Sequence, residues 1–430
     1  MAASPSPFPA FQSSGVARPV DSPEVFGAGR ELLSLALIDA RNHTLHLLSL
    51  YEQALGAALA QVPRRQGVVP PVWLAGHIGW FAESWIARNT QRAFGSACPA
   101  RPTRLASVEP HADDWWNPQQ GGPELCWANG LPGLVQTRSY LLETLEATLD
   151  LLARAAETDA GLYFYRLALL HEDLRGEQLV VMAQTLGLPL DFDPMPAVVT
   201  RPTLSLPATR WVLGAPDDSF AFAQEHGRES VDVPEFEIDA QPVTWSQFIE
   251  FVDDDGYDRD DLWHPQGRQW LLEQPDGRRG PRHVEQIGGS RHGTGGSVLQ
   301  QRFGRTVRAS GHHSAMHLSW WEADAWARWA GRRLATEVEW EIAAHQAERR
   351  GFRWGDVQEW VSGRLQPWTG YRSDAWSAGT SFDPQPAFGA ARVQRGASFA
   401  TASRLRWMKR RGFALPERDD GFFGFRTCAL

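Results

Sequence analysis

The chain contains the helical stretch Tyr165-Arg-Leu-Ala-Leu-Leu-His171-Glu-Asp-Leu-Arg175-Gly-Glu177, in which a histidine interrupts an apolar helix face. Positions four apart lie above one another on a helix, so a pair of metal ligands would need histidines at 171 and 175. Position 175 is an arginine, which stays protonated and has no lone pair for a metal. The stretch therefore predicts one ligand, His171, and a vacant ligand position one turn later.

Apolar residues recur at helical spacing in four segments of the N-terminal half. The four predicted helices cover residues 30–59, 72–90, 134–156 and 160–186. Pro70 and Pro71 suit the start of the second helix, and His77 falls in its second turn. Four helices of this length, with one long irregular connection, predict an antiparallel four-helix bundle whose core can hold a metal between facing helices.

The character of the chain changes after a proline-rich segment. Residues 189–207 contain five prolines and predict an extended linker. Beyond it, short β-type runs and frequent glycines accompany three predicted helices. These helices are 244–253, 319–331 and 336–347, with Thr244, Ser319 and Thr336 as N-caps and Glu at the capping-box position of the last two.

The predicted fold class is α+β, with two domains joined by a linker. We expect a disordered leader at 1–29, a four-helix bundle with a metal site at 30–188, the linker at 189–207 and a second domain at 208–430. A chain of 430 residues with 43% apolar content can bury a core in each domain.

Composition narrows the class of function. The net charge of −9, with scattered arginines, argues against a nucleic-acid partner. Three distant cysteines provide neither a disulfide framework nor a CxxC metal site, which favours a reducing compartment. We find no secretory signal and no run of 18 apolar residues, so we expect a cytoplasmic protein without a membrane partner.

Motifs in the C-terminal half are similar to those of one known domain family. They are Pro242-Val-Thr-x-x-x-Phe248, Leu318-Ser-Trp320-x-Glu322, Thr336-Glu337-x-Glu339-Trp340-Glu341, Gly355-Asp-Val357-Gln-Glu359-Trp360, Arg395-Gly396-Ala-Ser398-Phe399 and Gly424-Phe425-Arg426. In this order they resemble the formylglycine-generating-enzyme or sulfatase-modifying-factor module. The resemblance implies a C-type-lectin-like fold for this half.

The N-terminal half resembles a second family. Its motifs are Trp73-x-x-x-His77-Ile-x-Trp80-Phe81-x-Glu83 and His171-x-x-x-Arg175-x-Glu177, which resemble the DinB-type half of the ergothioneine-type sulfoxide synthases. That family combines the two halves in the same order. Within it, Leu37-Ile-Asp-Ala-Arg41-Asn-x-Thr44 and Leu170-His-Glu-Asp most resemble the branch that includes selenoneine synthase.

The resemblance implies a mononuclear non-haem iron(II) enzyme. Such an enzyme uses O2 to join the imidazole C2 of hercynine to the selenium of a selenosugar or the sulfur of a thiol. The family holds iron with three histidines, of which two match His77 and His171. The third position here is Arg175, and two family positions for hercynine recognition are Leu174 and Gly412.

Three outcomes follow for the vacant ligand position. A carboxylate completes a two-histidine, one-carboxylate face, for which the candidates are Glu177, Glu83 and Asp173. Alternatively, His43 or His46 on the first helix supplies the third ligand, or the metal is lost. Of these candidates, we assign Glu177 to the predicted metal set with His77 and His171.

Substrate and proton-donor candidates come from loops. Aromatic faces suit the trimethylammonium of hercynine, and the candidates are Trp115, Trp116, Trp407 and Phe413. Arg411 and Arg418 could clamp an anion of the second substrate, or neighbouring aspartates could neutralise them. In the family a tyrosine donates the proton, and the candidate here is Tyr371, with Trp376 as an alternative occupant of that place.

The sequence leaves two main functions open. The first is an iron-dependent C–Se or C–S bond-forming enzyme with small-molecule substrates, as a monomer or a simple homo-oligomer. The second is a catalytically silent relative that acts as a binding or regulatory protein, because Arg175 replaces a ligand. Formylglycine generation is disfavoured because it needs a pair of reactive cysteines, and the C-terminal half has only Cys428.

Overall fold

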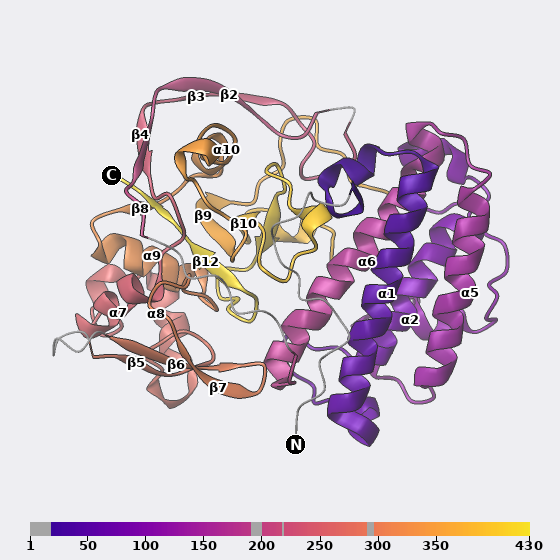
Figure 1. Ribbon diagram of the computed structural model, residues 1–430, viewed down its shortest axis with the longest axis horizontal. Coiled ribbons are helices and arrows are strands. Elements are labelled where there is room, and N and C mark those ends of the chain that lie inside the picture. The colour runs from indigo at the N-terminus through magenta and orange to yellow at the C-terminus, as the bar shows by residue number, and fades with distance from the viewer. Residues whose placement is uncertain (1–18, 191–199, 217–218, 290–295) are drawn as a thin grey trace, which may run out of the picture.

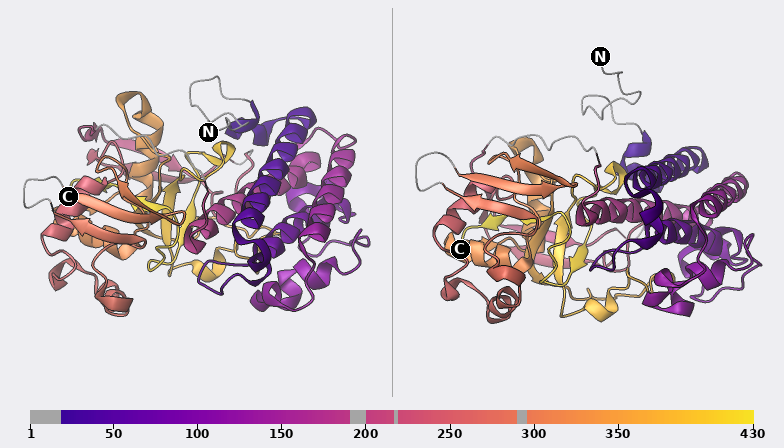
Figure 2. Two further views of the ribbon diagram at one scale, coloured as in Figure 1. Left: turned by 60° about the horizontal axis from the view of Figure 1, so that its bottom comes forward. Right: turned by 90° about the horizontal axis from the view of Figure 1, so that it is seen from below.

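The chain folds into a helical bundle packed against a mixed domain of strands and short helices. The computed structural model describes residues 19–190, 200–216, 219–289 and 296–430. Figures 1 and 2 show the bundle on one side and the C-terminal domain on the other, with helix α6 between them. The mixture of a helical N-terminal region with strands and helices in the C-terminal half agrees with the α+β class predicted from sequence.

Four long helices form the bundle. They are α1 (Arg30–Leu55), α2 (Pro71–Ala82), α5 (Leu134–Leu152) and α6 (Asp159–Leu186). A π-helical turn, Glu83–Ala87, continues α2, and 3-10 turns or short helices fill the connection to α5. These short helices include α3 (Ala112–Trp116) and α4 (Pro118–Gly121). All four predicted helices are confirmed, with ends shifted by a few residues.

The helix directions correct the predicted antiparallel arrangement. Arg41 Nε donates to Glu172 Oε1 at 2.7 Å, and ten residues further along α1 the hydroxyl of Tyr51 donates to the carbonyl of Leu179 at 2.6 Å. Contacts that advance together along both helices mean that α1 and α6 run in the same direction.

The other two helices run opposite to α1 and α6. Arg30 donates to the carbonyl of Ala153 at 2.8 Å, whereas Arg138 donates to Glu52 at 2.9 Å, so α5 is antiparallel to α1. His77 of α2 lies against His171 of α6, while Trp85, eight residues after His77, stacks on Phe164, seven residues before His171. The bundle is therefore up-down-down-up, because the long connection after α2 returns the chain before α5 begins.

Two boundaries predicted from sequence also change. Part of the expected leader forms 3-10 turns, Pro19–Asp21 and Pro23–Gly27, near the start of α1. Part of the expected linker forms strand β1 (Leu204–Leu206), because Leu204 and Leu206 alternate with a polar residue and bury against β4. Predictions for residues 1–18 and 191–199 fall outside the described residues.

Four sheets lie within the described parts of the C-terminal domain. Their strand orders are β1-β4-β13-β8, β11-β10-β9-β12, β2-β3 and β5-β6-β7. The strands are β1 (Leu204–Leu206), β2 (Thr209–Leu213), β3 (Glu229–Val233), β4 (Phe236–Ile238), β5 (Val284–Gly288), β6 (Ser297–Arg302), β7 (Arg305–Ala309), β8 (Arg333–Leu334), β9 (Gln358–Arg364), β10 (Arg392–Gly396), β11 (Gly412–Ala414), β12 (Phe423–Phe425) and β13 (Thr427–Cys428). Within these sheets only β9 and β12 pair in parallel.

Short capped helices cover these sheets. They are α7 (Trp245–Asp253), α8 (Pro265–Leu272), α9 (Trp320–Trp329) and α10 (Glu337–Gln346). Ser319 and Glu322 form the predicted capping box of α9, and Thr336 and Glu339 form that of α10. Throughout the described residues, no helix is both long and apolar enough to cross a membrane.

Buried polar contacts join α6 to the C-terminal domain. Arg404 donates from Nε and NH2 to both oxygens of Asp173, at 2.7 and 2.9 Å, and from NH1 to Asp39 at 2.9 Å. One turn further along α6, the carboxylate of Glu177 accepts from Ser398 and Thr401. The bundle and the C-terminal domain are therefore joined by charged groups withdrawn from water.

We predict that Arg404→Met destabilises the protein strongly. Asp173, whose side chain is 2% exposed, would lose its partner, and removal of one member of a buried ion pair costs about 3–5 kcal/mol. Chemical denaturation at pH 8 measures the change in the free energy of unfolding. The matched control is Arg210→Met, whose exposed pair with Asp232 is expected to contribute at most about 1 kcal/mol. Equal stabilities for both variants would contradict the prediction.

Candidate functional site

A cleft lies between α2, α6 and the C-terminal domain. It encloses about 650 Å³ of non-atom space, open solvent at its mouth included. Its aromatic lining residues are Trp80, Phe81, Trp85, Trp376 and Phe382, and its titratable ones are His77, His171, Arg104, Arg175 and Asp113. The connection between α2 and α5 contributes residues 117–120 to its rim.

His77 is oriented as a metal-binding or substrate-binding histidine would be. Its Nδ1 lies 2.9 Å from the carbonyl oxygen of Trp116, so the proton sits on Nδ1 and Nε2 keeps its lone pair. A backbone carbonyl on the second ring nitrogen is the usual support of a ligating imidazole. Burial, followed by the charge of Arg175, lowers the pKa of His77 to about 3. The imidazole is therefore neutral near neutral pH.

His171 lies beside His77, with ring centroids 5.2 Å apart. Its ring stacks on Phe81, at 3.8 Å between centroids. Its Nε2 accepts a hydrogen bond from Nε of Arg175 at 3.3 Å, and its Nδ1 is buried without a hydrogen-bond partner. Burial and then the neighbouring Arg175 lower the pKa of His171 well below its ordinary value. The Nε2 lone pair of His171, which could bind a metal, is therefore directed at the Arg175 guanidinium.

Arg175 occupies the space one turn beyond His171. Besides His171, its NH1 donates to Gln178 Oε1 at 2.7 Å and its NH2 donates to Ser381 Oγ at 3.2 Å. The guanidinium carbon lies 4.5 Å from the ring centre of Phe382. Burial lowers the pKa of Arg175 to about 10, which leaves the group charged at neutral pH. A fixed positive charge therefore stands beside the two histidines.

Glu177 does not join the histidine pair. Its Oε1 accepts from Gln358 at 2.8 Å, from Ser398 at 3.2 Å and from Thr401 at 2.7 Å, and Oε2 lies 3.5 Å from Arg410. Across the described ranges, no group of three or more His, Cys, Asp or Glu side chains could hold a metal ion. The predicted set of His77, His171 and Glu177 is therefore not assembled, because Glu177 points into the domain interface.

The other candidates for a third ligand are also engaged or remote. Glu83 accepts from Tyr140, Ser107 and the Val108 amide at 2.6–2.7 Å. Asp173 is paired with Arg404, as described above. His43 and His46 are exposed on α1, and neither is a lining residue of the cleft.

Trp115 and Trp116 contact α2 through their backbone carbonyls, outside the lining of the cleft. The carbonyl of Trp115 accepts from Trp73 Nε1 at 2.7 Å. Trp116 is 1% exposed, stacks on Tyr140 and packs on Gly76, where any side chain would clash with its ring. Neither indole is among the residues that line the cleft, and their contact with substrate stays a prediction. Trp116 instead fixes His77 through its carbonyl.

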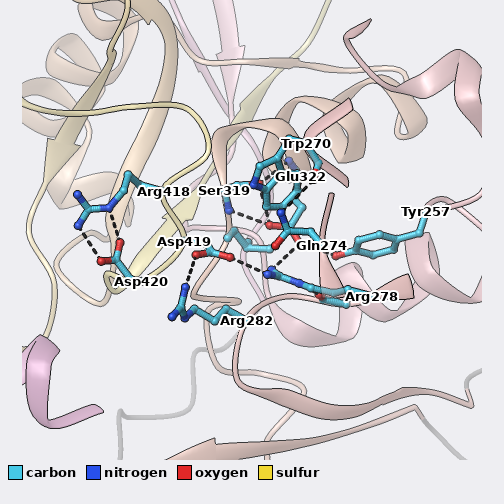
Figure 3. Close-up of polar contacts among 12 residues, drawn as sticks. Tyr257, Trp270, Gln274, Arg278, Arg282, Ser319, Glu322, Arg418, Asp419 and Asp420 are labelled. Atoms are coloured by element: carbon cyan, nitrogen blue, oxygen red, sulfur yellow. Dashed lines mark hydrogen bonds and ion pairs between the residues drawn. The ribbon is translucent and has the colours of Figure 1, made fainter. Parts of the chain in front are cut away.

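The predicted anion clamps are already paired. Arg411 is 1% exposed and donates to both oxygens of Glu337, at 2.9 and 3.0 Å. Arg418 makes a two-point contact with Asp420, at 2.6 and 2.7 Å (Figure 3). Asp420 therefore neutralises Arg418, which the sequence offered as the alternative to an anion clamp.

Figure 3 shows the wider polar network around Arg418. Asp419 accepts from Arg278 at 2.7 Å and from Arg282 at 2.9 Å, and Arg278 also reaches Glu322, which accepts from the Tyr257 hydroxyl at 2.8 Å. Charges in this network balance one another within the C-terminal domain.

Three further predicted residues lie away from the cleft lining. Phe413 is a half-buried residue of β11 that packs against the sheet core, and Trp407 lines a second, separate cavity. Tyr371 packs edge-on against Phe388. Trp376, the alternative to Tyr371, does line the cleft, and its ring lies edge-on to Phe81 with centroids 6.0 Å apart.

Sequence reasoning missed the ion pair that shapes one side of the cleft. Asp113 accepts from NH1 and NH2 of Arg88, at 2.9 and 2.7 Å, and from Trp80 Nε1 at 2.7 Å. The Arg88 hydrogen bond leads the lowering of the Asp113 pKa. Asp113 and Asn117 both line the cleft. No sequence signal linked Arg88 to Asp113.

Comparisons with known proteins give two results. Residues 194–376 match the family model described as sulfatase-modifying factor enzyme 1-like domain. Over nearly its whole length, the chain is similar to the hercynine oxygenases of Mycolicibacterium smegmatis (28% identity, 93% of this chain, 99% of the relative) and Mycobacterium tuberculosis (28% identity, 93% of this chain, 98% of the relative). The formylglycine-generating enzyme of Mus musculus is 27% identical over 44% of this chain and 49% of its own length.

These similarities confirm the coarser part of the resemblance. Residues 194–376 match the sulfatase-modifying-factor type of domain, and the chain has relatives named hercynine oxygenase across both halves. The DinB-type relationship of the helical bundle stays a prediction.

We predict that His77 is neutral, with its proton on Nδ1, at pH 5. Because its pKa is lowered to about 3, its charge changes only at more acidic pH than that of an ordinary histidine. Long-range ¹H–¹⁵N correlation spectra of ¹⁵N-histidine-labelled protein, assigned with His77→Gln, report both tautomer and charge. A His77 titration midpoint near 6.5 would contradict the geometry.

Proposed function

We propose that the cleft binds hercynine or a closely related histidine betaine, and that the chain belongs functionally with the hercynine oxygenases. The similarity to hercynine oxygenases across 93% of the chain supports this ligand class. The observation that carries the proposal is the pair of neutral imidazoles, His77 and His171, placed in a cleft with aromatic walls.

The aromatic lining suits a quaternary ammonium group. Trimethylammonium binds to the electron-rich faces of aromatic rings, with Trp the best of them. Trp80 and Trp376 both line the cleft.

For a catalytic role, we propose O2-dependent joining of the imidazole C2 of hercynine to the selenium of a selenosugar or the sulfur of a thiol. The selenium version has the support of the Leu37–Thr44 and Leu170–Asp173 motifs. Iron(II) is the cofactor that such a reaction would need, because protein side chains do not supply its one-electron chemistry.

The residues of the cleft do not fit a three-histidine iron centre. Nε2 of His171 accepts from Arg175, and the guanidinium stands at the third ligand position with a charge that repels a metal cation. Among the described residues no carboxylate or histidine takes its place. We therefore derive no catalytic step through iron.

The second candidate, a binding protein without turnover, has one specific observation in its favour. The hydrogen bond between Arg175 and His171 satisfies a buried imidazole nitrogen that iron would otherwise require. The geometry supports binding of the betaine more directly than its oxidation. Both candidates share the same ligand, so binding and turnover are tested separately.

We expect hercynine to bind more tightly than histidine, because only hercynine presents methylated ammonium to the aromatic walls. Titration calorimetry measures both affinities. Trp376→Ala should weaken hercynine binding about tenfold, which corresponds to about 1.4 kcal/mol. Trp127→Ala is the matched control, because Trp127 lies outside the cleft against Arg64. Equal binding of histidine and hercynine would rule out betaine recognition.

Metal loading separates the binding protein from the enzyme. After anaerobic incubation with Fe(II) and desalting, we expect little iron in the wild type and about one iron per chain in Arg175→His. His77→Ala in the Arg175→His background should lose that iron. One iron per wild-type chain, together with hercynine-dependent O2 consumption, would establish the catalytic candidate instead.

A further inference from the structure

Arg175 is a half-buried cation that lines the cleft and has no carboxylate partner in the part of the chain that the structure describes. Within the described residues, no aspartate or glutamate oxygen lies within 4 Å of its nitrogens. Its three hydrogen bonds all go to neutral acceptors, on His171, Gln178 and Ser381. The buried arginines that join the bundle to the C-terminal domain behave differently, since Arg404 contacts two carboxylates.

An isolated buried charge is costly unless an opposite charge compensates it. The face of Phe382 compensates only in part, because a cation–π contact is worth about 0.5–2 kcal/mol. NH1 and NH2 of Arg175 each use one N–H in the contacts described, which leaves one N–H on each for a further acceptor. An unused N–H on each outer nitrogen can donate to an oxygen of a carboxylate or phosphate.

The charges around Arg175 also favour the binding of an anion. His77 and His171 are neutral, and the single acid that lines the cleft, Asp113, is neutralised by Arg88. A second arginine of the lining, Arg104, stacks over Trp85 and donates to the Ser84 carbonyl. The lining is therefore positive where it faces the ligand space.

We propose that Arg175 makes the cleft an anion-binding site, which takes the carboxylate or phosphate of a small molecule where a metal ligand would otherwise stand. The anion and a metal at His171 exclude one another, because Nε of Arg175 holds the His171 lone pair while its two outer nitrogens hold the anion. This inference does not depend on hercynine, since it concerns charge and geometry at Arg175 alone.

The test uses the full chain with two simple probes, inorganic phosphate and acetate, in titration calorimetry at constant ionic strength maintained with chloride. We expect saturable binding of at least one probe to the wild type, at one site per chain. Phosphate alone would assign a phosphorylated ligand, and acetate alone or more tightly would assign a carboxylate. Failure of hercynine to bind would leave this result untouched, so the two proposals fail separately.

Variants at position 175 tie the binding to the guanidinium. Arg175→Met should weaken the bound probe at least tenfold, and Arg175→Lys should give an intermediate loss because it keeps the charge but not the fork. Arg210→Met, on exposed β2, is the control and should bind as the wild type does. Thermal melts establish that each variant is folded. If Arg175→Met does not fold, the loss of binding is measured on Arg175→Lys. Absence of saturable binding in the wild type, or undiminished binding in the folded position-175 variants, would overturn the proposal.

Discussion

Both halves of the protein depend on helix α6. Residues 171–177 of this helix contact three different parts of the protein. Glu172 is buried against Arg41 of α1, while Asp173 and Glu177 bind the C-terminal domain. His171 and Arg175, one turn apart on a third face, line the cleft. Because a helix advances by about 100° per residue, neighbouring residues must face different partners. A change in this stretch therefore affects the bundle, the domain interface and the cleft together.

Several motifs that suggested function turn out to build the framework. Arg41 and Thr44 from the first-helix motif both bind Glu172. In the C-terminal domain, Arg426 pairs with Glu359, and Trp340 donates to the same carboxylate. These charged groups are fully buried, so each needs its partner to avoid the cost of an isolated charge. A resemblance based on such residues identifies an architecture more directly than a reaction.

The sequence predicted local structure well and long-range pairing poorly. Helix positions, the Ser319 and Thr336 caps and the change of character after the linker depend on neighbours in the chain. The parallel direction of α1 and α6 depends on where a long connection returns, which no local pattern encodes. Arg411 looked available for a substrate because its partner, Glu337, is distant in sequence. The arginine at position 175 was correctly singled out, but its contacts with Ser381 and Phe382 come from the other domain.

The central claim is that the Arg175 guanidinium, and not a metal, occupies the position beside His77 and His171. The most direct measurement is anomalous X-ray diffraction, on both sides of the iron absorption edge, from wild-type crystals soaked anaerobically with Fe(II). We predict no anomalous peak between the two imidazoles, with Arg175 still donating to His171. A strong peak within bonding distance of both imidazoles, with Arg175 displaced, would contradict the account.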